Sequence, residues 1–208
     1  TDRNATVGAN TTFVVNVNGT APLSYQWQKQ VANGSYSDII GATDSNYTIT
    51  GVQLTDSKAY RLRISNTFGN ITSNDATLTV GITPAIIVHP VDINGTTGDN
   101  VGFTVQASGT PAPNYQWYRD GNLISGATAS SFAINNARFQ DSGNYWVKVF
   151  NAGGSVESQR AQLIVGGAPL ILTQPTDRNA TVGANTTFVV DVNGTTPLSY
   201  QWQRQELP

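Results

Sequence analysis

Hydrophobic and polar residues alternate over short stretches along the chain, as in half-buried β-strands. Turn-forming Gly and Asn residues separate these stretches, and a hairpin is predicted at 66–70. Short strands with frequent turns predict an all-β chain built as a sandwich or a barrel. In the first module the inward-facing positions are predicted to be Thr11, Phe13, Val15, Val17, Tyr25, Trp27, Tyr47, Ile49, Tyr60, Leu62, Ile64, Ala76, Leu78 and Val80.

One long segment of the chain occurs twice. Residues 1–30 return at 176–205 with three differences, at positions 16, 21 and 29 of the first copy. A more diverged relative of the pattern begins at Val101, so the chain contains three module starts, marked by Trp27, Trp117 and Trp202. The first and third modules are nearly identical and the second differs, which indicates a repeating block of two modules, about 175 residues long.

Two similar stretches, TLTVGITPAIIVHP and QLIVGGAPLILTQP, join one module to the next. Their Gly/Pro joints at 81–84 and 166–169 are short, which predicts neighbours held close in a semi-rigid rod. The predicted modules are 1–82, which lacks its first strand, 83–167, and 168–208, the N-terminal half of a third. We expect the chain to continue on both sides, because Phe188, Val190 and Trp202 of the half module would otherwise face water.

The composition removes several classes of function. The 208 residues include 11 Lys and Arg and 13 Asp and Glu, which gives a net charge of -2 and no basic surface for nucleic acid or acidic lipid. There is no Cys and no Met, so disulfides, thiolate catalysis and Cys-based zinc sites are excluded. No stretch approaches the roughly 20 apolar residues that span a bilayer. We therefore expect no nucleic-acid partner and no membrane insertion in this segment.

A motif shared by the modules resembles the intermediate-set immunoglobulin domain. A Trp in YQW follows a hydrophobic strand, and Asp-Ser-x-x-Tyr then ends at Tyr60 and at Tyr145. The resemblance implies tandem immunoglobulin-like antiparallel β-sandwiches, in which the tyrosine hydroxyl caps a backbone connection. Cysteine-free modules of this kind are similar to those of large bacterial surface and secreted proteins, which implies an extracellular or cell-surface location.

The resemblance also implies the residues of the core. Val15 and Leu62 stand at the two disulfide positions of the family in the first module, and Val105 and Val147 stand there in the second. The predicted structural core is Trp27, Trp117, Trp202, Tyr60, Tyr145, Val15, Leu62, Val105 and Val147.

No arrangement of residues predicts catalysis, so we expect no enzyme activity and no cofactor. Asp56 and Asp141 belong to the turn before the corner tyrosine, where a structural hydrogen bond is expected. The single histidine, His89, matches Gln174 at the other joint, so a solvated residue is expected rather than a member of a catalytic triad. No metal site is predicted, because no segment has the dense alternating acids of a calcium loop. The acids considered for calcium are Asp2, Asp92, Asp99 and Asp177.

Ten Asn-x-Ser/Thr triplets occur in this Asn- and Thr-rich chain. In a glycosylating host they would give a sugar-coated surface, whereas many bacteria would leave them bare. The candidate N-glycosylation sites are Asn4, Asn10, Asn18, Asn33, Asn46, Asn70, Asn94, Asn179, Asn185 and Asn193.

Strand alternation predicts an aromatic patch on one sheet face of the second module. If Tyr145 and Val147 point inward, Trp146 and Phe150 point outward beside Tyr118. We expect this patch to bind another copy of the chain, with arginine over tryptophan, or alternatively sugars; covering by loops is the third possibility. The candidate contact residues are Tyr118, Trp146, Phe150, Arg61, Arg63 and Phe68.

Three functions are compatible with these features. The leading hypothesis is a structural repeat segment of an extracellular fibre, stalk or surface assembly, whose partners are neighbouring modules or other copies of the chain. An adhesin with a surface-glycan-binding face is the second, and spacer modules of a large secreted enzyme are the third. The fold alone does not decide between them.

Overall fold

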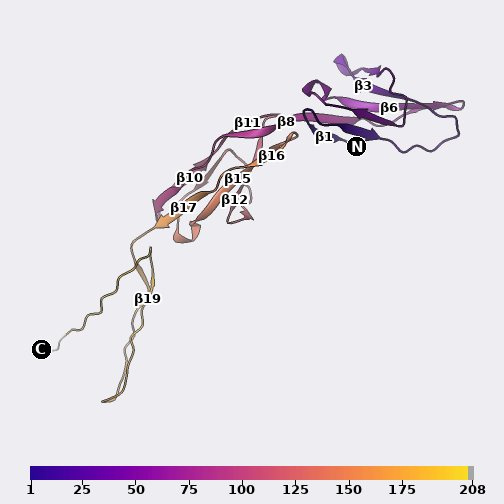
Figure 1. Ribbon diagram of the computed structural model, residues 1–208. Coiled ribbons are helices and arrows are strands. Elements are labelled where there is room, and N and C mark those ends of the chain that lie inside the picture. Colours follow the sequence, from indigo (N-terminus) through magenta and orange to yellow (C-terminus); the bar gives the residue numbers. More distant parts are fainter. Residues whose placement is uncertain (206–208) are drawn as a thin grey trace.

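The computed structural model describes residues 1–205, which contain β-strands and three short 3₁₀ helices. Figure 1 shows two complete sandwiches lying end to end, followed by an open third segment. The predicted all-β class is therefore confirmed. Residues 206–208, the end of the predicted third module, lie outside the described residues.

The first module packs a large sheet against a small one. The large sheet has the order β1-β8-β6-β3-β4, with β7 paired to β6, and the small sheet pairs β2 with β5. The strands are β1 Arg3–Thr6, β2 Thr11–Val14, β3 Ser24–Gln30, β4 Tyr36–Asp38, β5 Asn46–Ile49, β6 Ala59–Asn66, β7 Gly69–Thr72 and β8 Ala76–Val88, and the 3₁₀ helices are η1 Ala32–Gly34 and η2 Leu54–Asp56.

The second module repeats this plan. Its large sheet has the order β13-β12-β15-β17-β9, with β16 paired to β15, and its small sheet pairs β10 with β14. The elements are β9 Ile93–Thr96, β10 Val101–Thr104, β11 Gln106–Thr110, β12 Asn114–Arg119, β13 Asn122–Leu123, β14 Ser131–Ile134, η3 Phe139–Asp141, β15 Gly143–Asn151, β16 Gly154–Glu157 and β17 Ala161–Gly166. The first strand of each large sheet, β1 or β9, runs parallel to the last strand of its module.

An aromatic cluster forms the centre of each complete module. In the first, the ring of Phe13 lies 5.9 Å from that of Trp27 and 5.1 Å from that of Tyr60. In the second, Phe103 lies 6.0 Å from Trp117 and 4.7 Å from Tyr145. These rings fill the space between the two sheets, where Leu62, Val105 and Val147 are also buried.

Val15 does not take the central position that the family comparison implied. It is only half-buried and packs at the margin of the core. Its counterpart Val105 also follows the end of a strand but is 4% exposed; there the next segment, β11, pairs with β8, and the described residues of the first module form no such pair. Phe13, which is 2% exposed, lies on the strand itself and points between the sheets. The central inward residue of this strand is therefore an aromatic ring two positions earlier in the chain.

Polar groups of the YQW motif have backbone partners inside the module. The indole Nε1 of Trp27 donates to the carbonyl of Asp44 at 3.0 Å, and that of Trp117 donates to the carbonyl of Ala129 at 2.9 Å. The Gln26 amide donates to the carbonyl of Ile39 at 2.8 Å, and Gln116 does the same to Ile124. Satisfied donors make burial of these side chains favourable.

The third segment does not form a sandwich. Its only strands within the described residues are β18 Leu170–Thr173 and β19 Asp191–Asn193, which pair with each other. Trp202, predicted as a core residue by analogy with Trp27, is 52% exposed, and Phe188 is also exposed. The reason is the absence of a strand equivalent to β6 that would cover them.

Each corner tyrosine caps a turn of its own module. The Tyr60 hydroxyl donates to the carbonyl of Asp56 at 3.0 Å, and the Tyr145 hydroxyl donates to the carbonyl of Asp141 at 2.7 Å. Burial raises the pKa of both phenols above the ordinary value of 10.0, and the Asp56 carboxylate adds to the effect at Tyr60. The folded state therefore favours the neutral phenol.

Replacing Tyr145 by Phe should lower the free energy of unfolding of the second module by about 1 kcal/mol at neutral pH, because one hydrogen bond is lost. Because the pKa of Tyr145 is raised in the folded state, its neutral phenol stabilises the module below about pH 10, and this stabilisation is lost as the pH rises further. The free energy of unfolding of the wild-type module should therefore fall in alkali, and that of the variant should fall much less. Denaturant unfolding followed by amide resonances at pH 7 and above pH 10 measures both. Tyr200→Phe, in the exposed third segment, is the control, and an equal alkaline loss in Tyr145→Phe would contradict the assignment.

Candidate functional site

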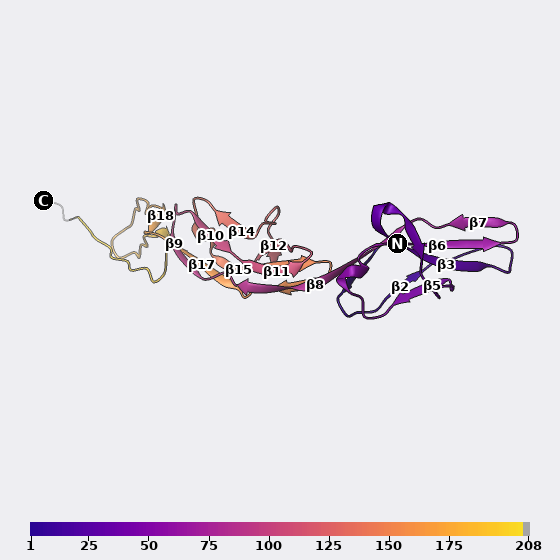
Figure 2. The same cartoon turned by 90° about the horizontal axis from the view of Figure 1, so that it is seen from above.

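The first two modules share one strand. The first half of β8 pairs with β1 and β6 of the first module, and residues 82–88 pair with β11 of the second. Figure 2 shows β8 spanning the junction. The sequence predicts a short Gly/Pro joint here, and the backbone crosses it as a continuous extended strand.

Two glycines bring the backbones of the modules into direct contact. Gly81 lies in β8, and Gly153 lies at the tip of the β15–β16 hairpin; both are buried. A Cβ on Gly153 would lie 2.5 Å from the carbonyl carbon of Gly81, and one on Gly81 would lie 2.4 Å from the nitrogen of Gly153. No side chain fits at either position unless the backbones move apart.

Hydrogen bonds close around this contact. The hydroxyls of Thr6 and Thr83 each donate to the carbonyl of Gly153 at 2.7 Å. The Asn151 amide donates to the carbonyl of Ile82 at 2.9 Å. We call this group, with Gly81, the clasp. The Thr6 bond joins the first module to the hairpin directly, whereas the bonds of Thr83 and Asn151 hold the hairpin on the part of β8 that pairs with the second module. Each bond contributes about 0.5–1.5 kcal/mol.

The junction between the second module and the third segment is built differently. The backbone N–H of Gly167 donates to the Thr195 hydroxyl at 2.9 Å. A Cβ on Gly194 would lie 3.1 Å from the Cα of Pro169, so the loop at 194–198 rests against the chain leaving the second module. The described residues contain no second hairpin at this junction.

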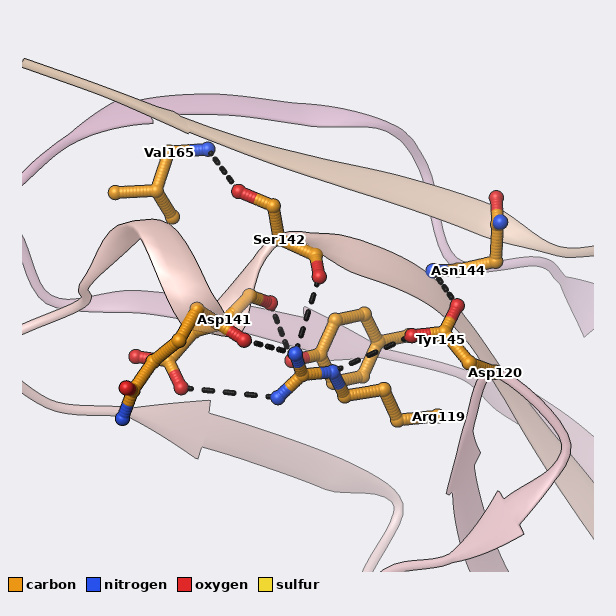
Figure 3. Close-up of polar contacts among 8 residues, drawn as sticks. Arg119, Asp120, Asp141, Ser142, Asn144, Tyr145 and Val165 are labelled. Carbon is orange, nitrogen blue, oxygen red and sulfur yellow. Dashed lines mark hydrogen bonds and ion pairs between the residues drawn. The ribbon is translucent and has the colours of Figure 1, made fainter. Parts of the chain in front are cut away.

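A polar network ties together the end of the second module that faces the third segment (Figure 3). Arg119 lies 3.8 Å from the carboxylate of Asp141 and donates to the carbonyls of Gln140 and Ser142. The Ser142 hydroxyl accepts a hydrogen bond from the backbone N–H of Val165 at 3.0 Å. The network fixes the corner turn against the last strand.

Acidic residues of the joints and turns serve as backbone acceptors. Asp56 accepts from the N–H of Gln53 at 2.8 Å, and Asp141 accepts from that of Arg138 at 2.9 Å. Bonds from the backbone N–H and hydroxyl of Thr96 lower the pKa of Asp99. Across residues 1–205, no three His, Cys, Asp or Glu side chains gather closely enough to hold a metal ion.

His89 is not the solvated residue that the sequence suggested. It is half-buried, and its Nδ1 accepts a hydrogen bond from the backbone N–H of Gln159 at 3.0 Å. The side chain therefore ties the start of the second module to the segment between β16 and β17. It has a structural contact that Gln174 does not show in the third segment.

The predicted aromatic patch is largely covered by its own module. Trp146 is only 8% exposed, because Tyr118 stacks on it across the strand pair at 4.1 Å and 5° and Arg160 lies 5.7 Å from its ring. Its Nε1 is buried without a hydrogen-bond partner among the described residues. Trp146 is thus a second, smaller packing layer on the outer face, and Phe150, 38% exposed, is what remains open.

The two arginines of the matching face in the first module also have partners of their own. Arg61 donates to the Gln28 amide oxygen at 2.8 Å and lies over the ring of Tyr36 at 3.8 Å. Arg63 lies 3.9 Å from Asp38. The expected pairing of these arginines with Trp146 of another copy would require both sides to give up contacts they already make.

Two other groups of predicted residues lie open to solvent. Phe68, at the tip of the β6–β7 hairpin, is 82% exposed. The asparagines of all ten Asn-x-Ser/Thr triplets are exposed as well.

The sequence places Gly81 and Thr83 in the predicted joint at 81–84 but gives no sign of their partners. Thr6 and Gly153 lie far from the joint in the chain, and neither belongs to a motif. The one available signal was the pair of glycines at 153 and 154 where the first module has Phe68 and Gly69, which indicates that the two hairpins meet different neighbours.

Comparison with known proteins places each complete module separately. A family model for the immunoglobulin domain matches residues 83–151, and a model for a domain of unknown function (DUF8696) matches residues 1–82. The chain is 27% identical over 170 residues to Endoglucanase C of Cellulomonas fimi, covering 79% of the chain and 15% of that protein. It is 26% identical over 210 residues to mouse leucine-rich repeats and immunoglobulin-like domains protein 3, covering 90% and 19%. The chain thus spans less than a fifth of the length of these relatives.

Solved structures share the arrangement of modules. Extracellular domains 3–5 of Drosophila OTK superpose with a TM-score of 0.56 at 22% identity, covering 79% of this chain and 59% of that one. The titin I-band fragment I67–I69 gives 0.51 at 23% identity, covering 94% and 74%. The fold is therefore a tandem array of immunoglobulin-like β-sandwiches, as the sequence predicts. In the described part of the chain, no helix has the length and apolar character to cross a bilayer.

Replacing Gly153 by Ala should loosen the junction without unfolding either module, because the added Cβ must displace the Gly81 backbone while the modules stay intact. Residual dipolar couplings of the two modules should fit one alignment tensor in the wild type and two different tensors in the variant. Ser155→Ala, at an exposed position of the same hairpin, is the matched control and should behave as wild type. A single shared tensor in Gly153→Ala would show that the contact does not fix the orientation.

Proposed function

We propose that this chain is a stiff structural segment of an extracellular or cell-surface assembly, such as a fibre, stalk or surface layer. The observation that carries the proposal is the shared strand β8, closed by the Gly81–Gly153 contact. Modules joined by one strand and a buried backbone contact transmit orientation along the array, which is what a spacer or filament needs.

Two further features support this function. The first module type returns after the second, so the arrangement is one that can be extended by adding blocks. The acidic side chains and the histidine discussed above hold backbone turns, which leaves them without a catalytic arrangement in the described residues. The chain matches only one part of each of the relatives named above, 15% of one and 19% of the other.

A stiff rod should give one narrow distance between the first two modules. The chain has no cysteine, so Ile40→Cys and Leu123→Cys, both at exposed positions, introduce two unique spin labels. Pulsed electron paramagnetic resonance should give a single distribution about as narrow as that between labels at Ile40→Cys and Ile71→Cys within the first module. A distribution several times broader than this internal control would contradict the stiff segment.

A spacer within a large secreted enzyme is the second candidate. It is favoured by the similarity to part of Endoglucanase C, which covers 79% of this chain. The physical role would be the same, since a stiff non-catalytic array would hold a catalytic domain at a fixed distance. An adjoining catalytic domain in the complete protein is the observation that distinguishes this case from a fibre.

Lateral contact between copies, or binding of surface glycans, would use the open part of the outer face of the second module. A shallow groove there is lined by Gln116, Tyr118, Lys148, Phe150 and Ser155. The partly exposed rings of Tyr118 and Phe150 suit either a protein surface or a sugar ring.

Phe150→Ser should weaken self-association by roughly tenfold, because the exposed ring is lost and the core is untouched. Sedimentation velocity over a concentration series measures the effect. Val14→Ser, at an apolar position on the other module that is 62% exposed, is the control. If both variants associate as wild type, the groove is not a lateral contact, and titration with oligosaccharides then tests the glycan alternative.

A further inference from the structure

The β6–β7 hairpin at the outer end of the first module carries an aromatic side chain that nothing covers. Phe68 is 82% exposed, with Ile71 also exposed, and the hairpin lies at the end of the module away from the second one (Figure 2). We propose that this end, formed by Phe68 and the loop at 19–23, docks on the closing end of a module of the second type from a preceding block. The inference rests on the proposed function, since it requires an array of alternating modules.

The hairpin of the first module has the same local structure as the hairpin that closes the clasp. The N–H of Phe68 donates to the Asn66 side-chain oxygen at 2.9 Å, and the N–H of Gly153 donates to that of Asn151 at 2.8 Å. Phe68 therefore stands in the first module type where Gly153 stands in the second. Gly153 is the residue that contacts the preceding module, so Phe68 occupies the contact position of its own type.

The chain itself brings a first-type leading end against the second module. Residues 176–205 repeat residues 1–30, and their loop at 194–198 already rests on the strand leaving the second module through Thr195 and Gly194. In the complete first module the equivalent loop is tied to the hairpin, because the Asn66 amide donates to the carbonyl of Thr20 at 3.0 Å. The same tie in a complete copy would carry the Phe68 hairpin to the backbone of Gly167.

The second module's closing end lacks the polar partners that hold Gly153 at the first junction. Ala168 stands where Thr83 stands, so one hydroxyl donor is missing. Thr96 stands where Thr6 stands, but its hydroxyl donates to Asp99 at 2.9 Å inside its own module. A hairpin carbonyl placed here would receive neither of the bonds that the clasp provides.

The same end has a smaller residue beside an aromatic ring instead. Gly167 stands where Ile82 stands in the first module, which removes a large side chain from the edge of the contact. A Cβ on Gly167 would lie 3.0 Å from the ring of Phe139 and 3.0 Å from the Thr97 hydroxyl, so the ring and the hydroxyl flank the glycine closely. The sizes of the facing residues are exchanged between the two junctions. The first junction has the large Ile82 beside the hairpin that carries Gly153, and the proposed second junction has the small Gly167 beside the hairpin that carries Phe68. Apolar burial would replace hydrogen bonding as the force between these modules.

The experiment uses the chain through Gln205, continued with a second copy of residues 31–82, so that the third module is complete. Phe68→Ser is introduced either in the added copy, where the residue would be docked, or in the first copy, where it stays at the free end. Hydrogen exchange of the amides at 166–173 should become about tenfold faster with the substitution in the added copy and stay unchanged with the substitution in the first. Phe68→Leu in the added copy should retain most of the protection, because its side chain is still apolar.

Burial of Trp202, followed by its fluorescence, reports whether the third module folds. Unfolding of the third module with the substitution in the added copy would also support docking, provided that the first module stays folded with the same substitution. The first copy shows in that case that the substitution alone does not unfold a module of this type. Equal exchange in both variants, or equal loss in both, would overturn the proposal. The stiffness of the first junction is measured separately with spin labels, so a failure here leaves the proposed function standing with a mobile second junction.

Discussion

Pairing between the Trp strand and the strand that carries the corner tyrosine is the interaction on which each module depends. In the first module, β3 pairs with β6 over six positions, from Ser24 with Ser65 to Lys29 with Tyr60. The same sequence at 199–205, with one substitution, forms no strand in the described part of the chain. Residues 186–189 are likewise identical to β2 and form no strand. Local sequence sets the pattern, but the partner strand supplies the hydrogen bonds and the apolar surface that turn the pattern into a sheet.

The aromatic ring between the two sheets explains how the modules manage without a disulfide. A cross-link of this kind contributes about 2–4 kcal/mol, whereas removing one fully buried Phe or Trp ring from a core costs about 3–5 kcal/mol. Phe13 and Phe103 each place such a ring between the Trp and the corner tyrosine of their module. One well-packed aromatic ring is therefore comparable in effect to the missing bond, and it imposes no requirement for an oxidising environment.

The sequence predicts the features that arise from strand periodicity and short motifs. It does not predict contacts between residues that lie far apart in the chain. Alternation and the YQW and Asp-Ser-x-x-Tyr motifs were sufficient for the all-β class, because these signals arise within a single strand or turn. Alternation also put Trp146 on the outer face, but it could not show that Tyr118 and Arg160 cover the ring. The clasp was missed for the same reason, since Gly81 and Gly153 meet only after two modules have folded. Val15 was misplaced because the resemblance treats both modules alike, whereas within residues 1–205 only the second has the β11–β8 pair beside the position that Val105 fills.

The two junctions together place a constraint on the order of modules. At the first junction, Gly81 and Gly153 leave no room for a side chain, so the Phe68 hairpin of a first-type module would not fit against the closing end of another first-type module. The second module's closing end has Gly167 and Ala168 in place of Ile82 and Thr83, so it would not supply the hydroxyl of Thr83 to a Gly153 hairpin. Each type of closing end is thus suited to the leading end of the other type. If the Phe68 hairpin docks as proposed, alternation along the chain follows from the shape and polarity of the contacts, and a duplication that preserved stiffness would copy the modules in pairs.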